Sequence, residues 1–363
     1  MSHPRPTPAD DPFLAEIGRQ PAAIRGAARA IAGQTDRLRR LAADRPDGRL
    51  VLTGMGSSYD ACHVTVTILA EAGTVAGLVN AAELLHFRTA TLDAATTLLV
   101  VSQSGQSVEI VRLLERLAGR ADRPFVVSIT NGLDNPLAAG ADVALDTAVG
   151  DELGPSTMTF AASLVALDAV VRVLSGGPGA AGEVDRIVER VLADAEAAAA
   201  ATEALLAERA AVTATMVGWG SGRPNLVILG RGVSRATAEM AALTIKEVSG
   251  APAESLVTAD FRHGPLELID EELAVAFVAL EPVTDAIDRS FAAELASGPA
   301  AVVVIGPAAP AGVARSVVVG PVDRRLAPAV AMIPFQLLAR ELAIARGRRP
   351  GEFSLATKVT TRE

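Results

Sequence analysis

Short apolar runs and longer amphipathic segments alternate along this chain of 363 residues. Runs such as 97–101 and 273–280 are almost wholly apolar and have the length of buried strands. Segments such as 108–117 and 234–248 carry apolar residues at the spacing of one helix face. Strands and helices that alternate in this way predict an α/β fold, in which helices cover both faces of mostly parallel sheets.

The same patterns predict the individual elements of two halves. In the first half, strands are predicted at 49–53, 75–79, 97–101, 125–130 and 143–147, and helices at 13–43 (interrupted at Pro21), 58–72, 81–87, 108–117 and 156–174. In the second half, strands are predicted at 225–229, 273–280, 300–305 and 316–319, and helices at 234–248, 283–295 and 327–346. We therefore expect a flexible tail (1–12), a first domain (13–182), an alanine-rich connector helix (183–215) and a second domain (216–363).

A repeated motif indicates that the two halves arose by duplication. Gly54-Met55-Gly56-Ser57-Ser58 follows the first strand of one half, and Gly230-Arg231-Gly232-Val233-Ser234 follows that of the other, 176 positions later. Glycine permits a tight strand-to-helix turn, and serine caps the helix that follows. The chain is thus predicted to contain two tandem, doubly wound parallel-sheet domains.

Residues 102–107 read Ser-Gln-Ser-Gly-Gln-Ser and lie between a predicted strand and a predicted helix. Such a loop directs hydroxyl and backbone N–H donors at one point, which favours an anion such as phosphate. An ordinary turn with a serine N-cap is the alternative. Two other helix starts carry hydroxyls, Ser57 with Ser58 and Ser156 with Thr157. In an open parallel sheet these turns share the carboxyl edge, where ligands bind.

The two halves differ at this loop, and no common nucleotide motif accompanies it. Where the first half has 102–107, the second has Leu280-Glu281-Pro282, so we expect one phosphate site per chain, in the first half. The sequence has no Walker A motif, and a dinucleotide fingerprint begun by Gly54 and Gly56 would have Tyr59 at its third glycine position. No cofactor is therefore expected.

Two residues of the second half are candidates for proton transfer. Glu247 continues the helical stripe of Met240 and Leu243 into the last turn of its helix. Desolvation and the helix dipole would there favour the protonated carboxyl and suit a general base. The alternative is an exposed carboxylate, or one paired with an arginine. His263 lies in the irregular segment 260–265, either positioned for use or simply exposed in a loop.

Only two of the 33 basic residues are lysines, Lys246 and Lys358. Lysine, unlike arginine, can lose its proton and act as a base or a nucleophile. Lys358 lies in a C-terminal segment that alternates apolar and polar residues and could dock onto the folded chain, although tails are usually inert. Lys246 adjoins Glu247 but faces elsewhere on the helix, which favours a structural ion pair.

The composition argues against several classes of protein. A net charge of −9 and an aromatic content of 3% argue against a nucleic-acid surface. Cys62 is the single cysteine, interpreted as a packing residue, and four histidines are scattered, so no metal site is predicted. No apolar run approaches the roughly 18–20 residues that span a bilayer, and residues 1–13 lack the apolar core of a secretory signal. A cytoplasmic protein that binds no membrane is therefore expected.

Taken in order, these motifs resemble those of the SIS (sugar isomerase) domain family, above all the isomerase half of glucosamine-6-phosphate synthases and relatives without a glutaminase half. The resemblance extends from about residue 17 to the C-terminus and implies two flavodoxin-like domains. It rests on Gly56-Ser57-Ser58-Tyr59, the loop 102–107, Pro155-Ser156-Thr157, Leu229-Gly230-Arg231-Gly232, Lys246-Glu247, Arg262-His263-Gly264-Pro265 and Lys358-Val359-Thr360.

The resemblance also implies roles for individual residues. Glu247 would move a proton between C1 and C2 of an open-chain sugar. His263 would open the sugar ring, often in the partner subunit's site, so a homodimer with sites at the subunit interface is expected. The residues that the resemblance implies as ligands of a sugar phosphate are Ser57, Ser102, Gln103, Ser104 and Ser107.

Three departures from the family pattern concern lysines. The synthase lysine that forms a Schiff base with the ketose is displaced by one place at Lys358, and Met158 and Thr244 replace two others. These departures suggest a different substrate or a different ammonia chemistry. The sequence has no glutaminase half and no N-terminal cysteine nucleophile, so we expect the direction that releases ammonia.

The leading hypothesis is a phosphosugar isomerase or aminosugar-phosphate deaminase. It would act on a hexosamine 6-phosphate-like substrate by aldose–ketose proton transfer with release of ammonia. Two alternatives remain open. One is a non-catalytic phosphosugar sensor, and the other is synthesis of an aminosugar phosphate with ammonia from elsewhere.

Overall fold

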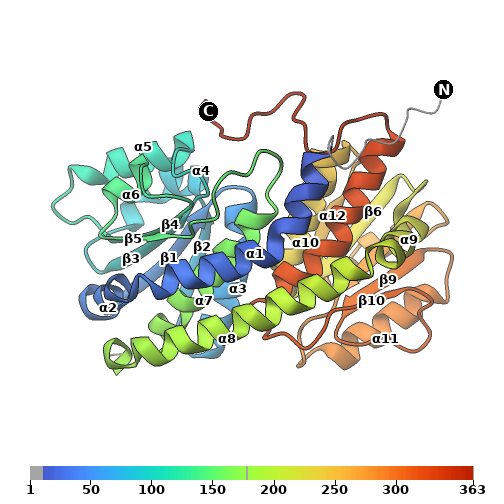
Figure 1. Cartoon of the computed structure of the whole chain (residues 1–363), viewed down its shortest axis with the longest axis horizontal. Coiled ribbons are helices and arrows are strands. Elements are labelled where there is room, and N and C mark those ends of the chain that lie inside the picture. Colours follow the sequence, from blue (N-terminus) through green and yellow to red (C-terminus); the bar gives the residue numbers. More distant parts are fainter. Residues whose placement is uncertain (1–10, 177–178, 363) are drawn as a thin grey trace. The chain divides into compact units, whose positions relative to one another are not determined.

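The computed structural model describes residues 11–176 and 179–362 and confirms the predicted α/β fold with two parallel sheets (Figure 1). The described residues divide into two compact units, each built on one five-stranded sheet. The first-sheet unit comprises 22–151, 158–176, 179–196 and 356–362. The second-sheet unit comprises 11–21, 152–157 and 197–355.

The first sheet has the strand order β2-β1-β3-β4-β5, with every pair parallel. Its strands are β1 (Arg49–Gly54), β2 (Ala76–Asn80), β3 (Thr96–Val101), β4 (Phe125–Thr130) and β5 (Val143–Asp146). Its helices are α2 (Thr35–Asp44), α3 (Ser57–Glu71), α4 (Ala81–Glu83), α5 (Val108–Ala118), α6 (Pro136–Gly140) and α7 (Met158–Ser175), with the short turns η2 (Leu84–Arg88) and η3 (Thr89–Thr91).

Helices cover both faces of this sheet, which explains why its central strand is wholly apolar or hydroxylated. Every residue of β3 is buried. Helices α2, α3 and α7 pack together on one face, while α4, η2, α5 and α6 pack on the other. A parallel strand between two helical layers is buried on both faces, so neither face needs polar side chains.

The second sheet has the strand order β10-β9-β8-β6-β7, again wholly parallel. Its strands are β6 (Asn225–Gly230), β7 (Glu254–Val257), β8 (Leu273–Val278), β9 (Ala301–Gly306) and β10 (Ser316–Val318). Its helices are α9 (Arg209–Gly220), α10 (Ser234–Ser249), α11 (Asp285–Ala296) and α12 (Ala327–Ala345), with the turns η5 (Asp260–Arg262) and η6 (Pro265–Leu268). Read from β7, the strands follow the same topology as the first sheet, as the predicted duplication requires.

Two predicted helix boundaries differ from the structure. Helix α1 (Pro12–Ala32) continues through Pro21, where an interruption was expected, and ends before Gly33 instead. Proline removes one N–H donor but does not force a break where the surrounding helix is well packed. The predicted connector is not one helix over 183–215, because α8 (Ala180–Ala207) ends before Glu208 and α9 follows at once.

Some elements were not predicted, and others begin at a different residue. The pattern missed the edge strand β7 and the five-residue helix α6, both too short for a clear periodicity. Helix α7 begins at Met158 rather than at Ser156. Residues 1–10 of the predicted tail lie outside the described residues, and Pro12 is already the first residue of α1.

Two helices, α7 and α12, are long and apolar enough to cross a membrane by length and composition alone. In the folded chain 89% of the α7 window and 83% of the α12 window is buried. Their apolar character is therefore accounted for by packing, α7 against α3 and α12 against α10.

Trp219, the single tryptophan, anchors α9 to the second sheet. Its side chain is fully buried, and its indole N–H is shared between the carbonyl oxygens of Val275 (3.1 Å) and Ala301 (3.2 Å). Its ring meets Phe335 edge-on at a centroid distance of 6.4 Å. One side chain thus joins two strands and two helices of the second-sheet unit.

We expect Trp219→Phe to lower the free energy of unfolding by about 2–3 kcal/mol, because it removes the buried indole hydrogen bond to the two strands and opens a void. Urea unfolding followed by far-UV circular dichroism measures the change. Val283→Ala, at a side chain that is 81% exposed, is the control and should change the free energy by no more than about 0.5 kcal/mol. Equal effects of the two substitutions would contradict the anchoring role.

Candidate functional site

The hydroxyl loop 102–107 begins where β3 ends, at the carboxyl edge of the first sheet. The N–H of Ser102 still pairs with the carbonyl of Ile129 at 3.0 Å, so the loop starts from the sheet itself. The Ser102 hydroxyl then accepts the N–H of Gly105 (3.2 Å), and the Ser104 hydroxyl accepts the N–H of Gln106 (3.1 Å). A hydroxyl that accepts one hydrogen bond retains its own proton for donation to an anion.

Helix α6 fixes the shape of this loop. Gly105 has φ +62°, and a Cβ there would collide with the side chain of Asn135. Asn135 caps α6 by accepting the N–H of Ala138 (2.9 Å), and the Gly105 carbonyl accepts the N–H of Leu137 (3.2 Å). Sequence reasoning missed this support, although Asn135 followed by Pro136 is a recognisable helix-start signal.

Helix α5 begins directly after the loop, with Ser107 as its N-cap. The Ser107 side chain makes no capping hydrogen bond, which differs from the ordinary capped turn considered as the alternative. The N–H of Val108 instead donates to the carbonyl of Thr360 at 3.1 Å. The C-terminal segment therefore docks at the start of α5, and it brings the half-buried Lys358 into the first-sheet unit.

Ser57 and Ser58 lie at the same sheet edge as the hydroxyl loop. Both begin α3 after β1, and β1 is the neighbour of β3 in the sheet. The turn is tight: a Cβ on Gly54 would come within 2.9 Å of the Val101 carbonyl oxygen. Ser57 is half-buried and Ser58 is buried. The structure thus brings together two of the three predicted hydroxyl turns.

The third hydroxyl turn, Ser156 with Thr157, belongs to the second-sheet unit. Thr157 is fully buried, and both its N–H (2.8 Å) and its hydroxyl (3.1 Å) bind Oε1 of Glu152. The hydrogen bonds of Thr157 are those of an ordinary capped helix start before α7. This was the alternative to phosphate binding. Glu152 itself, buried five residues upstream, could not be identified from the sequence pattern.

Glu247 lies in the last turn of α10 as predicted, and its side chain is half-buried. The helix ends in a left-handed Gly250 (φ +66°), whose N–H returns to the Lys246 carbonyl at 2.9 Å. Lys246 is exposed. The helix therefore fixes the backbone of Glu247 at a defined end, while the side chain has partial access to solvent.

His263 is exposed and follows the short turn η5. The preceding Arg262 forms an ion pair with Glu294 of α11 at 2.5 Å, and its guanidinium lies 3.7 Å from the centre of the Phe291 ring. Phe261, two residues before His263, is fully buried in the core under the second sheet. The backbone beside His263 is thus held at two points although the imidazole itself faces solvent.

Met158 and Thr244 replace two lysines of the family pattern, and both are buried. Met158 is the first residue of α7. The Thr244 hydroxyl lies one turn before Glu247 on α10 and has no hydrogen-bond partner among the described residues. The two positions therefore place an apolar thioether and a hydroxyl where the pattern has charge.

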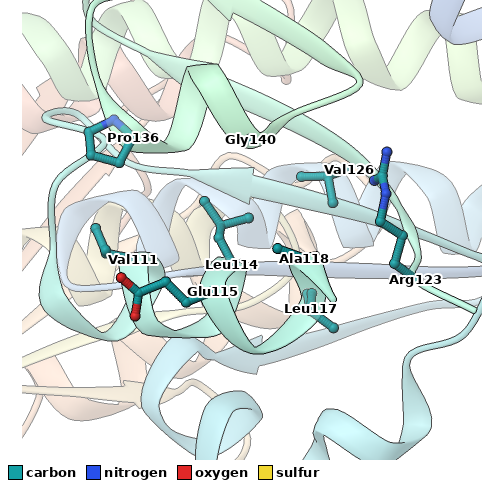
Figure 2. Close-up of a pocket in the computed structure, with 9 residues that line it drawn as sticks. All are labelled: Val111, Leu114, Glu115, Leu117, Ala118, Arg123, Val126, Pro136 and Gly140. Carbon is teal, nitrogen blue, oxygen red and sulfur yellow. The ribbon is translucent and has the colours of Figure 1, made fainter. Parts of the chain in front are cut away.

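No group of three or more His, Cys, Asp or Glu side chains suited to a metal ion occurs within residues 11–176 and 179–362. One cavity of about 390 Å³ lies elsewhere in the first-sheet unit, between α5, α6 and β4 (Figure 2). It is lined mainly by apolar side chains such as Val111 and Leu114, and its Arg123 is already paired with Asp142 at 2.6 Å. None of the predicted site residues lines this cavity.

Comparison with known proteins gives one family and several similar chains. The sequence model of the SIS domain family matches residues 45–172 and again residues 221–346. A glutamine–fructose-6-phosphate aminotransferase (isomerizing) of Aeropyrum pernix is 30% identical over 361 residues, which cover 97% of this chain and 57% of that protein. The chain thus spans little more than half of the length of this relative.

Two solved structures share the fold over nearly the whole chain. The C-terminal domain of glucosamine-fructose-6-phosphate aminotransferase from Francisella tularensis has a TM-score of 0.82 at 21% identity, covering 94% of this chain and 98% of that one. Glucosamine-6-phosphate deaminase from Thermotoga maritima has a TM-score of 0.73 at 19% identity, covering 96% and 99%.

The single cysteine gives a direct test of how the first-sheet unit is packed. Cys62 is fully buried on α3, where desolvation, with a smaller contribution from Asp60, raises the pKa of its thiol far above the usual range. We expect native protein to react with Ellman's reagent only as this unit opens, even at about pH 9 where an ordinary thiol is ionised.

The reference thiol for this measurement is Leu355→Cys in a Cys62→Ser background, because Leu355 is fully exposed. Absorbance of the released thiolate should rise at once for the reference, and for Cys62 only when denaturant is added. Native labelling of Cys62 at the rate of the reference would contradict the packing of α3.

Proposed function

Because the chain belongs to the SIS domain family, whose model matches both of its halves, we propose that it is a phosphosugar isomerase that also releases ammonia. The substrate is an aminosugar phosphate of the hexosamine 6-phosphate kind. The observation that carries the proposal is the loop 102–107, whose hydroxyls, together with the uncommitted side chain of Ser107 at the start of α5, are suited to a phosphate.

In this proposal the first-sheet unit binds the phosphate. Ser102, Gln103, Ser104 and Ser107 supply donors from the loop, with Ser57 and Ser58 beside them at the same sheet edge. Loop 102–107 contains no group that acts as a general base at neutral pH. Holding a phosphate that does not react allows its binding energy to orient the carbons that do.

The second-sheet unit supplies the proton chemistry. His263 assists opening of the sugar ring, and Glu247 then takes the proton from C2 of the open-chain aldose. O1 gains a proton from solvent, and Glu247 returns the C2 proton to C1. The resulting C2 iminium is hydrolysed by water, so that ammonia leaves and a ketose phosphate remains. Partial burial of Glu247 at the end of a rigid helix supports its part in this sequence.

Three finer features belong to the same proposal. The chain aligns with the isomerizing part of an aminotransferase and shares its fold with a glucosamine-6-phosphate deaminase, which favours chemistry at an amino-bearing carbon. We propose a cytoplasmic homodimer, which sedimentation equilibrium would test. Lys358, held by the docked C-terminal segment, is a candidate for contact with the carbonyl form of the substrate.

We expect Glu247→Gln to lower kcat by about 10²- to 10⁴-fold with little change in KM, because it removes the proton acceptor and keeps the shape. Ammonia released from glucosamine 6-phosphate and from related aminosugar and fructosamine phosphates is measured with a coupled dehydrogenase. Glu239→Gln, the same change on the same helix, is the control and should retain activity. Wild-type turnover by Glu247→Gln would exclude the proposed base, and binding without any turnover would favour a sensor.

We expect Ser107→Ala to raise KM by about 10- to 100-fold while kcat changes little, because a hydrogen bond to a charged phosphate is lost equally in ground and transition states. Thr91→Ala, at an exposed hydroxyl of the same unit, is the matched control. Michaelis–Menten kinetics with the substrate found above give both constants. An unchanged KM would remove Ser107 from the phosphate site.

A further inference from the structure

The two sheets can be compared position by position at their carboxyl edges. After β3, the N–H of Ser102 donates to the Ile129 carbonyl at 3.0 Å. After β8, the N–H of Ala279 donates to the Ile305 carbonyl at 2.8 Å. In each sheet the bond joins the third and fourth strands of the duplicated topology, so Ala279 corresponds to Ser102. Two residues further on, Glu281 therefore takes the place of Ser104.

The Glu281 carboxylate points to the start of α10 rather than to solvent. Its side chain is only 3% exposed. One carboxylate oxygen accepts the N–H of Val233 at 2.6 Å, directly before α10, and the other pairs with Arg324. Gly232 has φ +56°, and a Cβ there would collide with this same carboxylate. The turn at Gly232 therefore leaves room for the Glu281 carboxylate.

The backbone N–H and guanidinium donors beside this carboxylate also have partners within the chain. The hydroxyl of Ser234, which corresponds to Ser58 in the repeat, accepts the N–H of Leu280 at 3.1 Å. Arg231 pairs with Asp288 of α11 at 2.9 Å, and the Asp288 side chain is only 3% exposed. Two arginines and a helix start thus converge where two buried carboxylates lie. A carboxylate buried to this degree is stable only when it is paired and hydrogen-bonded.

We infer that the carboxyl edge of the second sheet is an anion site that the chain fills with its own Glu281 carboxylate. Glu281 substitutes there for a bound oxyanion, held by the Val233 N–H and by Arg324. The chemical class that fits these donors when Glu281 is withdrawn is a small tetrahedral oxyanion such as phosphate or sulfate. Under the proposed function, on which this consequence depends, each chain binds one sugar phosphate, in the first-sheet unit.

The inference predicts that an anion in solution can replace the missing carboxylate. Glu281→Ser, which installs the side chain found at Ser104, vacates the site, whereas Glu281→Gln removes the same charge but leaves the space filled. We expect both variants to melt below the wild type in chloride, because each removes the buried carboxylate that pairs with Arg324. Inorganic phosphate, exchanged for chloride at constant ionic strength, should raise the Tm of Glu281→Ser by about 2–4 °C more than that of the wild type or of Glu281→Gln.

A second substitution shows whether the rescued site is this one. Arg324→Gln combined with Glu281→Ser should abolish the additional stabilisation by phosphate, because it removes the paired cation. Equal phosphate responses of the wild type, Glu281→Ser and Glu281→Gln would overturn the inference. If Glu281→Ser does not fold in chloride, its recovery in phosphate supports the inference, and failure in both media contradicts it. None of these readouts depends on turnover, so they stand apart from the test of the proposed enzyme.

Discussion

Backbone N–H groups converge at the carboxyl edge of each parallel sheet, and the need to satisfy them governs the rest of this structure. Helices that start from such an edge present partial positive charge and unpaired donors. In the first sheet the hydroxyl loop precedes α5, the Thr360 carbonyl accepts the Val108 N–H, and the Ser107 side chain makes no capping bond. The second sheet meets this requirement with Glu281, a buried carboxylate of its own chain. One duplicated scaffold thus solves the same electrostatic problem in two ways.

The supports of the hydroxyl loop are as important as its hydroxyls. Asn135 packs against Gly105, and the Thr360 carbonyl binds the first N–H of α5. Both partners come from segments remote in sequence from the loop. A loop held at several points can bind an anion without first being ordered, which preserves binding energy for the reacting end of a substrate.

Periodicity and turn chemistry predicted much of this fold because both are local properties. The alternation of apolar runs with amphipathic segments was sufficient to predict the two parallel sheets, and the repeated Gly-x-Gly turns at Gly54 and Gly230 predicted their duplication. The hydroxyls of Ser57 and Ser102 reach one sheet edge because β1 and β3 are neighbours. That neighbourhood follows from the doubly wound topology.

Other features depend on contacts between distant residues, and no local pattern encodes them. Nothing around Thr157 indicates that Glu152 binds its N–H and its hydroxyl. The continuity of α1 through Pro21 likewise depends on its surroundings, since Gln20 beside it is buried and donates to Gln336 of α12 at 2.7 Å. Docking of the tail at Thr360 could be suspected from its alternation, but its site could not.

The composition of the two units has a consequence for the order of folding. The first-sheet unit includes residues 356–362, and the second-sheet unit includes residues 11–21, which pack against α12 through Arg340 and Asp11 at 2.6 Å. On the ribosome, neither unit therefore possesses all of its parts until α12 and the segment after it have emerged. Each sheet can pair its strands earlier, but completion of either unit requires α12 and the residues after it to have been synthesised. A polypeptide that stalls before α12 lacks Arg340 and Gln336, the partners of Asp11 and Gln20, so the start of α1 cannot complete its packing.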